Sequence, residues 1–176
     1  LNSPESEVYH KSQVLYGLFQ AKQAISRANK VYLVEGYTDV ISMHQAGVHN
    51  VVSSSGTSLT LEQIRLVKRL TEHVTLLYDG DKAGIKASFR GIDLLLEEGM
   101  YVRAVPLPAG EDPDSLARSM DAESLNTFLA ANEVDFMRFK VEALTEEGQA
   151  QDPIRRAEVV RDEVRHRCPN RACPAQ

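Results

Sequence analysis

Apolar residues along this chain occur in two patterns, and their alternation predicts the order of the secondary structure. Four short runs rich in apolar β-formers are typical of strands, at residues 31–34, 51–54, 74–78 and 101–105. We predict helices before and between them, over residues 11–27, 37–45, 61–70 and 83–98. The run at 74–78 is apolar almost throughout, as in strands that helices cover on both faces. The order predicts an α/β fold with a mostly parallel sheet of about four strands flanked by helices.

Local signals at the helix ends support these assignments. Thr60 and Gln63 have the spacing of a capping box, and Asp112 precedes Pro113 as an N-cap precedes a proline at the first helical position. In the helix over residues 11–27 we expect the Leu and Phe side chains to pack against the rest of the protein. After residue 105 the β-α alternation ends, and we expect the C-terminal third to be all helical.

Composition narrows the class of protein. The formal net charge of -5 argues against tight nonspecific binding to a nucleic-acid backbone. If DNA is the partner, we expect much of the binding affinity to come from parts of the protein other than this chain. Cys168 and Cys173 fit a reducing compartment and are too few for a structural zinc site. No signal-peptide pattern opens the chain, and no run approaches the ~20 apolar residues of a membrane helix. We therefore expect a cytoplasmic protein with no membrane partner.

Carboxylates follow two of the predicted strands directly. Glu35 and Gly36 come after the strand at 31–34, and Asp79, Gly80 and Asp81 come after the strand at 74–78. Ligands of open α/β sheets bind outside the carboxyl ends of the strands, so these acids converge if the two strands are neighbours. Converging carboxylates require a cation, and Mg²⁺ is the hard ion that carboxylates share with substrate phosphates. The pattern predicts metal-assisted phosphoryl chemistry, with the two glycines as turn residues.

Four stretches, taken in order, resemble the bacterial replicative DNA primases. They are residues 1–5 with His10-Lys11 and 15–18, residues 34–40 (VEGYTDV), residues 78–84 (YDGDKAG) and residues 108–114 (PAGEDPD). The similarity is to the toprim part of the RNA polymerase domain, and it covers most of the chain. Topoisomerases and small toprim nucleases share only the middle two stretches. The tail after about residue 165 has no counterpart in the family.

The resemblance implies a metal-dependent nucleotidyltransferase that makes short RNA primers on single-stranded DNA from ribonucleoside triphosphates. Glu35 would be the toprim glutamate, a metal ligand or a general base, and metal ligation would fall to Asp79, Asp81, Asp112 and Asp114. Lys11 would face template or nucleotide. Mg²⁺ would be the cofactor, with Mn²⁺ as a substitute. The family's zinc-binding domain and its domain for the replicative helicase are expected to be absent from this chain.

Pattern and resemblance together divide the chain into four parts. We expect residues 1–28 to be the end of a preceding subdomain with a connecting helix, and 29–115 to be the toprim α/β domain. Residues 116–165 are expected to form a helical subdomain, and 166–176 a disordered tail.

Simpler explanations exist for several of these residues. Asp81 and Asp112 can serve only as helix N-caps, and Glu35 can be a solvated loop acid. Lys82, Lys86 and Arg90 recur every four residues; they can bind phosphates or form a solvated helix face. Two other classes of function also stay open. One is a toprim nuclease or topoisomerase-like enzyme that cleaves phosphodiesters, and the other is a nucleotide-binding or interaction module without catalysis.

Overall fold

A computed structural model describes residues 6–7, 10–54, 59–78, 91–108 and 110–136 of the 176-residue chain. The chain divides into two compact units, Leu1–Val134 and Asp135–Gln176. The helices and strands named below lie in the first unit, except for Asp135, which begins the second. No helix among the described residues is both long and apolar enough to cross a membrane.

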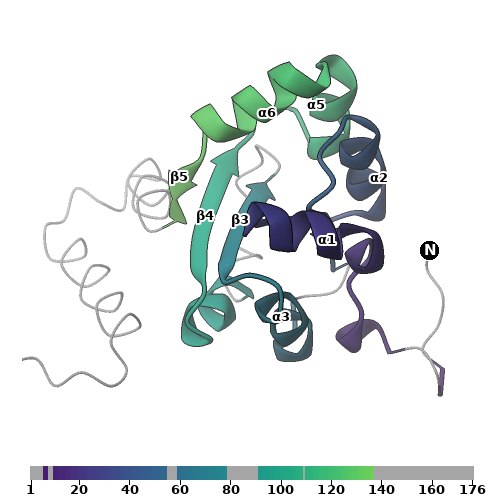
Figure 1. The fold of residues 1–176 in the computed structure, drawn as a ribbon, viewed down its shortest axis with the longest axis vertical. Helices are drawn as coiled ribbons and strands as arrows, with labels where there is room; N and C mark the ends of the chain where they lie inside the picture. Colours follow the sequence, from purple (N-terminus) through teal and green to yellow (C-terminus); the bar gives the residue numbers. More distant parts are fainter. Residues whose placement is uncertain (1–5, 8–9, 55–58, 79–90, 109, 137–176) are drawn as a thin grey trace, which may run out of the picture. The chain divides into compact units, whose positions relative to one another are not determined.

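The described strands form one sheet in the order β2-β1-β3-β4-β5. They are β1 (Val31–Val34), β2 (Val51–Ser53), β3 (His73–Tyr78), β4 (Tyr101–Pro106) and β5 (Val134–Asp135). The pairs β1–β2, β1–β3 and β3–β4 are parallel, which confirms the predicted α/β class with a mostly parallel sheet (Figure 1). The expectation that the C-terminal third is all helical is wrong at β5. This two-residue strand lies at the edge of the sheet, and the sequence around it has no run of β-forming residues that would predict it.

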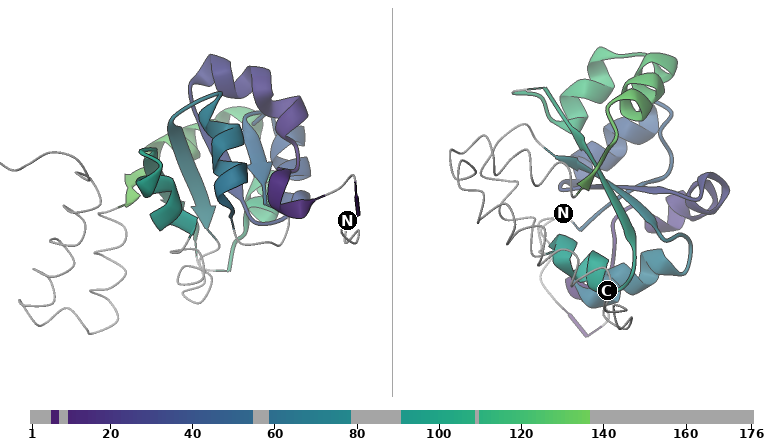
Figure 2. Two further views of the ribbon diagram at one scale, coloured as in Figure 1. Left: turned by 90° about the horizontal axis from the view of Figure 1, so that it is seen from below. Right: turned by 90° about the vertical axis from the view of Figure 1, so that its left-hand side faces the viewer.

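Helices flank the sheet on both faces. They are the 3-10 turn η1 (Lys11–Gln13), then α1 (Leu18–Ala28), α2 (Tyr37–Gln45), α3 (Leu61–Lys68), α5 (Pro113–Ser119) and α6 (Ala122–Ala131). Residues 91–97 are helical too. The right-hand view of Figure 2 shows α2, α5 and α6 on one side of the sheet and α3 with residues 91–97 on the other.

A hydrophobic core joins the sheet to α2, α5 and α6. Tyr32 and Val34 of β1 are buried there, together with Leu77 of β3. They meet buried side chains of the three helices: Val40, Met43, Leu116, Ala117, Leu125 and Leu129. The helices α5 and α6 thus share one core with the strands β1 and β3. The predicted boundaries at residues 29, 116 and 166 stay predictions, and the expected tail lies outside the described residues.

The predicted helix over residues 11–27 is wrong in its first half. The chain forms η1 and then an extended segment in which Tyr16 exchanges two backbone hydrogen bonds with Ser53, at 2.9 and 3.1 Å. Gly17 follows at φ +81°, a left-handed conformation that ends this segment, and α1 begins at the next residue. Phe19, expected to pack inside, is 76% exposed. Pairing with β2 overrides the helical spacing.

The other helix boundaries agree well with the sequence. The helix α2 spans the predicted residues 37–45, and α3 ends two residues before the predicted residue 70. Thr60 accepts from the backbone N–H of Gln63 at 3.2 Å, and the Gln63 side chain accepts from that of Thr60 at 3.1 Å, which confirms the capping box. Asp112 is the N-cap of α5, and Pro113 is its first residue.

A polar cluster lies at the amino ends of β1 and β3. The carboxylate of Glu133, whose side chain is 11% exposed, accepts a hydrogen bond from Thr75 and pairs with Lys30 at 3.5 Å and Arg103 at 3.4 Å. Burial acts to lower the pKa of Lys30, but the Tyr32 hydroxyl and the Glu133 carboxylate outweigh it and leave that pKa raised. The cluster ties the segment after α6 to the sheet.

Candidate active site

The carboxyl ends of β1 and β3 lie next to each other. The two strands are parallel neighbours, and Leu33 pairs with Leu76. Glu35 is therefore level with Tyr78, after which the chain continues to Asp79. This adjacency is the condition on which the sequence-based argument for converging acids depends. Glu35 is exposed at this edge, whereas Asp79, Gly80 and Asp81 lie outside the described residues.

A buried carboxylate fixes the turn that carries Glu35. The backbone N–H of Gly36 donates to Oδ2 of Asp39 at 2.8 Å, and Asp39 is only 9% exposed. Gly36 has φ −97°, which any residue adopts, so its turn is not the reason for a glycine. A side chain there would instead place Cβ 3.0 Å from Asp39 Oδ2. Close approach of the carboxylate is what favours glycine at this position.

Asp39 was not predicted as a site residue. The Gly36–Asp39 pair has the three-residue spacing of a capping box, and that spacing was the available signal. The spacing is easily overlooked, because a glycine at the N-cap has no side chain that would indicate a capping box. Asp39 thus holds the first turn of α2 and, through the N–H of Gly36, the backbone next to Glu35.

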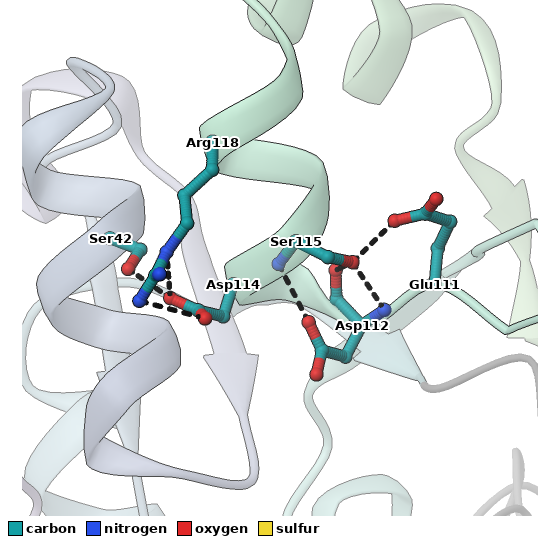
Figure 3. Close-up of polar contacts among 6 residues, drawn as sticks. All are labelled: Ser42, Glu111, Asp112, Asp114, Ser115 and Arg118. Carbon is teal, nitrogen blue, oxygen red and sulfur yellow. Dashed lines mark hydrogen bonds and ion pairs between the residues drawn. The ribbon is translucent and has the colours of Figure 1, made fainter.

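The acidic segment before α5 shows local capping contacts (Figure 3). Oδ1 of Asp112 accepts from the backbone N–H of Ser115 at 2.7 Å, and the Ser115 hydroxyl accepts from the N–H of Asp112 at 3.0 Å. The same hydroxyl donates to Glu111. Asp112 therefore serves as a helix N-cap, as the simpler explanation of this residue predicted. The cap uses Oδ1, so Oδ2 does not take part in it.

Asp114 connects two helices. Its Oδ1 accepts from the buried Ser42 hydroxyl of α2 and, at 3.1 Å, from Nε of Arg118 one turn later in α5, while its Oδ2 lies 3.0 Å from the Arg118 guanidinium (Figure 3). The Asp114 side chain is 24% exposed. Because α2 begins directly after Glu35 and Gly36, this contact joins α5 to the helix that starts at the candidate site.

Comparison with known proteins identifies the region. A model of the "Toprim-like" family matches residues 32–117. DNA primases of Halalkalibacterium halodurans and Listeria monocytogenes are 44% and 40% identical over 141 and 153 residues, which are 80% and 86% of this chain. A crystal structure of a DNA primase domain from Pseudomonas aeruginosa superposes with a TM-score of 0.75 at 37% identity, covering 84% of this chain and 47% of that one.

A structure of the DnaG primase catalytic domain bound to single-stranded DNA has a TM-score of 0.77 at 36% identity, covering 90% of this chain and 52% of that one. The chain carries the toprim region of the bacterial DnaG-type primases. It spans about a quarter of the length of the curated primases that it matches, 24% for each of the two named here. The resemblance derived from the four sequence stretches is thus confirmed.

The remaining predicted residues of this primase region divide into two groups. Lys11 lies half-buried in η1, and its backbone carbonyl accepts from the Gln63 side chain at 2.9 Å. Lys82, Lys86 and Arg90 lie outside the described residues. Within the described part of the chain, no three His, Cys, Asp or Glu side chains form a group that could hold a metal ion. The metal and nucleotide roles of these residues stay predictions.

Proposed function

We propose that this chain is the metal-binding part of a primase catalytic core, which makes short RNA primers on single-stranded DNA. The observation that carries the proposal is the parallel adjacency of β1 and β3, which brings the end of the Glu35 strand beside the end of the Asp79 strand. The identity of 40–44% to proteins named DNA primase supports the same function. A divalent metal, a DNA template, ribonucleoside triphosphates and a replicative helicase belong to this proposal.

The chemistry of the donor set fits a hard divalent cation. Every residue proposed around the ion offers carboxylate oxygen, the ligand type of Mg²⁺ and Mn²⁺. Glu35 is exposed at the edge of the sheet, so a bound ion can keep water molecules and also reach a phosphate. We propose Glu35, Asp79 and Asp81 as its principal ligands. When bound, such an ion supplies charge neutralisation for the transferring phosphoryl group and its leaving pyrophosphate.

The chain's own residues would position the reactants. Glu35 would ligate the metal or accept the proton of the attacking hydroxyl, since either role needs a carboxylate at the reacting centre. Lys11, Lys82 and Lys86 would attract template or triphosphate through their charge. Asp39 would keep the backbone beside Glu35 in place.

Asp112 and Asp114 remain proposed as additional ligands. Asp112 could bind through the oxygen that does not cap α5. Asp114 would have to exchange or share its contacts with Arg118 and Ser42, since both of its oxygens have described partners. The ion pair with Arg118, whose side chain is 71% exposed, is the weaker of these contacts because solvent screens it.

A chimera tests the function directly. The matching quarter of the Halalkalibacterium halodurans primase would be replaced by this chain and supplied with Mg²⁺, a single-stranded template and labelled ribonucleotides. We expect primers from the chimera and none from its Asp79→Ala variant. Asp121→Ala, which removes the N-cap of α6, is the control and should still make primers.

Two other results would overturn the proposal. Nicking of plasmid DNA without primer synthesis would instead indicate a toprim nuclease or topoisomerase-like cleaving enzyme. A folded chimera with neither activity would indicate a nucleotide-binding or interaction module.

A further inference from the structure

An apolar groove lies on the surface between residues 14–20, which include the first turn of α1, and the helix α2. Its volume is about 490 Å³. One wall is formed by residues 14–20, and the other by Val40, Ile41, His44 and Gln45 of α2. None of the lining residues carries a carboxylate, an ammonium or a guanidinium group. Glu35, Gly36, Asp112 and Asp114 are not among the residues that line it.

Exposed apolar side chains gather around this groove. Val14, Phe19 and Ile41 line it and are 43%, 76% and 41% exposed. Tyr37, 37% exposed, adjoins it through an edge-on ring contact with the lining residue Tyr16, with centroids 6.0 Å apart. These are four of the five large apolar side chains that are exposed within the described residues. Single exposed apolar residues are ordinary, but a contiguous group beside a groove is typical of an interaction surface.

One polar atom on the groove wall lacks a partner. Nε2 of His44 is buried and has no hydrogen-bond partner among the described residues. Nδ1 of the same ring lies 3.4 Å from Nδ1 of His49. Burial and the neighbouring His49 lower the pKa of His44 from its ordinary value. A buried polar atom without a partner costs free energy.

One positive charge lies at the rim of the groove, that of Lys22, although the chain as a whole is negative. The Lys22 ammonium lies 4.5 Å from the centroid of the exposed Phe19 ring. A partner with acidic side chains along one edge therefore complements this rim.

We propose that the groove is a docking site for an amphipathic helix of a partner protein, with its apolar face in the groove and acidic residues beside Lys22. Five of the eleven lining residues are aliphatic, and such side chains line grooves that receive helices through residues spaced by three and four positions. Single-stranded nucleic acid fits less well, because it needs open aromatic faces for stacking and Lys22 already lies over the Phe19 ring.

The test uses a designed helical peptide and the intact protein that carries this chain. The fluorescently labelled peptide has about 18 residues, with Leu on one face and Glu on the other. Binding is measured by fluorescence anisotropy. We expect Phe19→Ala and Ile41→Ser each to weaken binding by about tenfold. Neither side chain is in the buried core, since Phe19 is 76% and Ile41 41% exposed, so these variants should fold. Tyr101→Ala, which removes another exposed aromatic ring on β4, is the matched control and should bind like the wild type.

A charge swap tests the acidic edge. Lys22→Glu should weaken binding of the Glu peptide, and a peptide with Lys in place of Glu should bind this variant better than the wild type. Equal affinity of the Phe19→Ala and wild-type proteins would overturn the proposal. So would oligo(dT) that binds at this face and displaces the peptide, or a dimer whose dissociation follows Phe19→Ala in sedimentation.

Discussion

Asp39→Ala should destabilise the fold and displace Glu35. The substitution removes the acceptor of a 2.8 Å hydrogen bond from Gly36, at a carboxylate that is 9% exposed. A hydrogen bond to a charged group contributes about 1.5–3 kcal/mol, and an acid in the first turn of a helix adds roughly 0.3–1 kcal/mol through the helix dipole. We therefore expect the free energy of unfolding to fall by about 2–3 kcal/mol.

Urea denaturation followed by circular dichroism measures the stability of this variant. Asp39→Asn keeps the shape and a neutral acceptor, so it should lose only about 1 kcal/mol. If Glu35 is a ligand, Mn²⁺ affinity measured by calorimetry should fall by about tenfold for Asp39→Ala, as when outer-shell partners of ligands are removed. The control is Asp121→Ala, which removes an exposed N-cap bond on α6 and should leave Mn²⁺ affinity unchanged. A stability within about 0.5 kcal/mol of the wild type would refute the reasoning about Asp39.

Three further predictions concern the scaffold. Gln63→Leu should lower the free energy of unfolding by about 2–4 kcal/mol. The Gln63 side chain is fully buried, and its amide donates hydrogen bonds to two backbone carbonyls before α1, at 2.9 and 2.8 Å. An unchanged urea denaturation curve would contradict this prediction. Gly17→Ala should cost more than Gly99→Ala by thermal melting. Both glycines have positive φ, but only the first would place a Cβ 2.8 Å from another side chain, so equal costs would contradict the clash. The raised pKa of Lys30 contributes stability that is complete below its ordinary value of 10.5 and is lost as pH rises through the higher folded value. Glu133→Gln should reduce that alkaline loss in pH-dependent melts, and an unchanged profile would exclude Glu133 as a cause.

Much of the fold could be predicted because local pattern and tertiary packing agree. The strands at residues 31–34 and 101–105 and the helix at 37–45 occur within a residue of their predicted bounds. The predicted parallel sheet also follows from the alternation of strands with helices. Around Tyr16 the local sequence pattern and the tertiary packing favour different structures. Its helical spacing favours α-helix, but a bridge to Ser53 and the left-handed Gly17 keep the chain extended, and neither is visible in periodicity.

The candidate site could be predicted in part. The position of Glu35 directly after a strand follows from an apolar run that ends in an acid. The adjacency of that strand to β3 was only a condition of the sequence-based prediction, and the order of the sheet meets it. The contacts of Asp114 could not be predicted, because Ser42 precedes it by 72 residues and only the packing of α5 on α2 brings them together. Asp39 was missed for a different reason: the capping-box spacing to Gly36 is present in the sequence, but a glycine has no side chain that would mark it as an N-cap.

The central claim is that Glu35, Asp79 and Asp81 share a divalent ion at the carboxyl edge of the sheet. Anomalous diffraction from a crystal soaked in Mn²⁺ tests it most directly. We predict a peak at about 2.0–2.3 Å from carboxylate oxygens of Glu35 and of at least one of the two aspartates. A well-ordered edge without a peak, or Mn²⁺ bound only at other carboxylates, would contradict it.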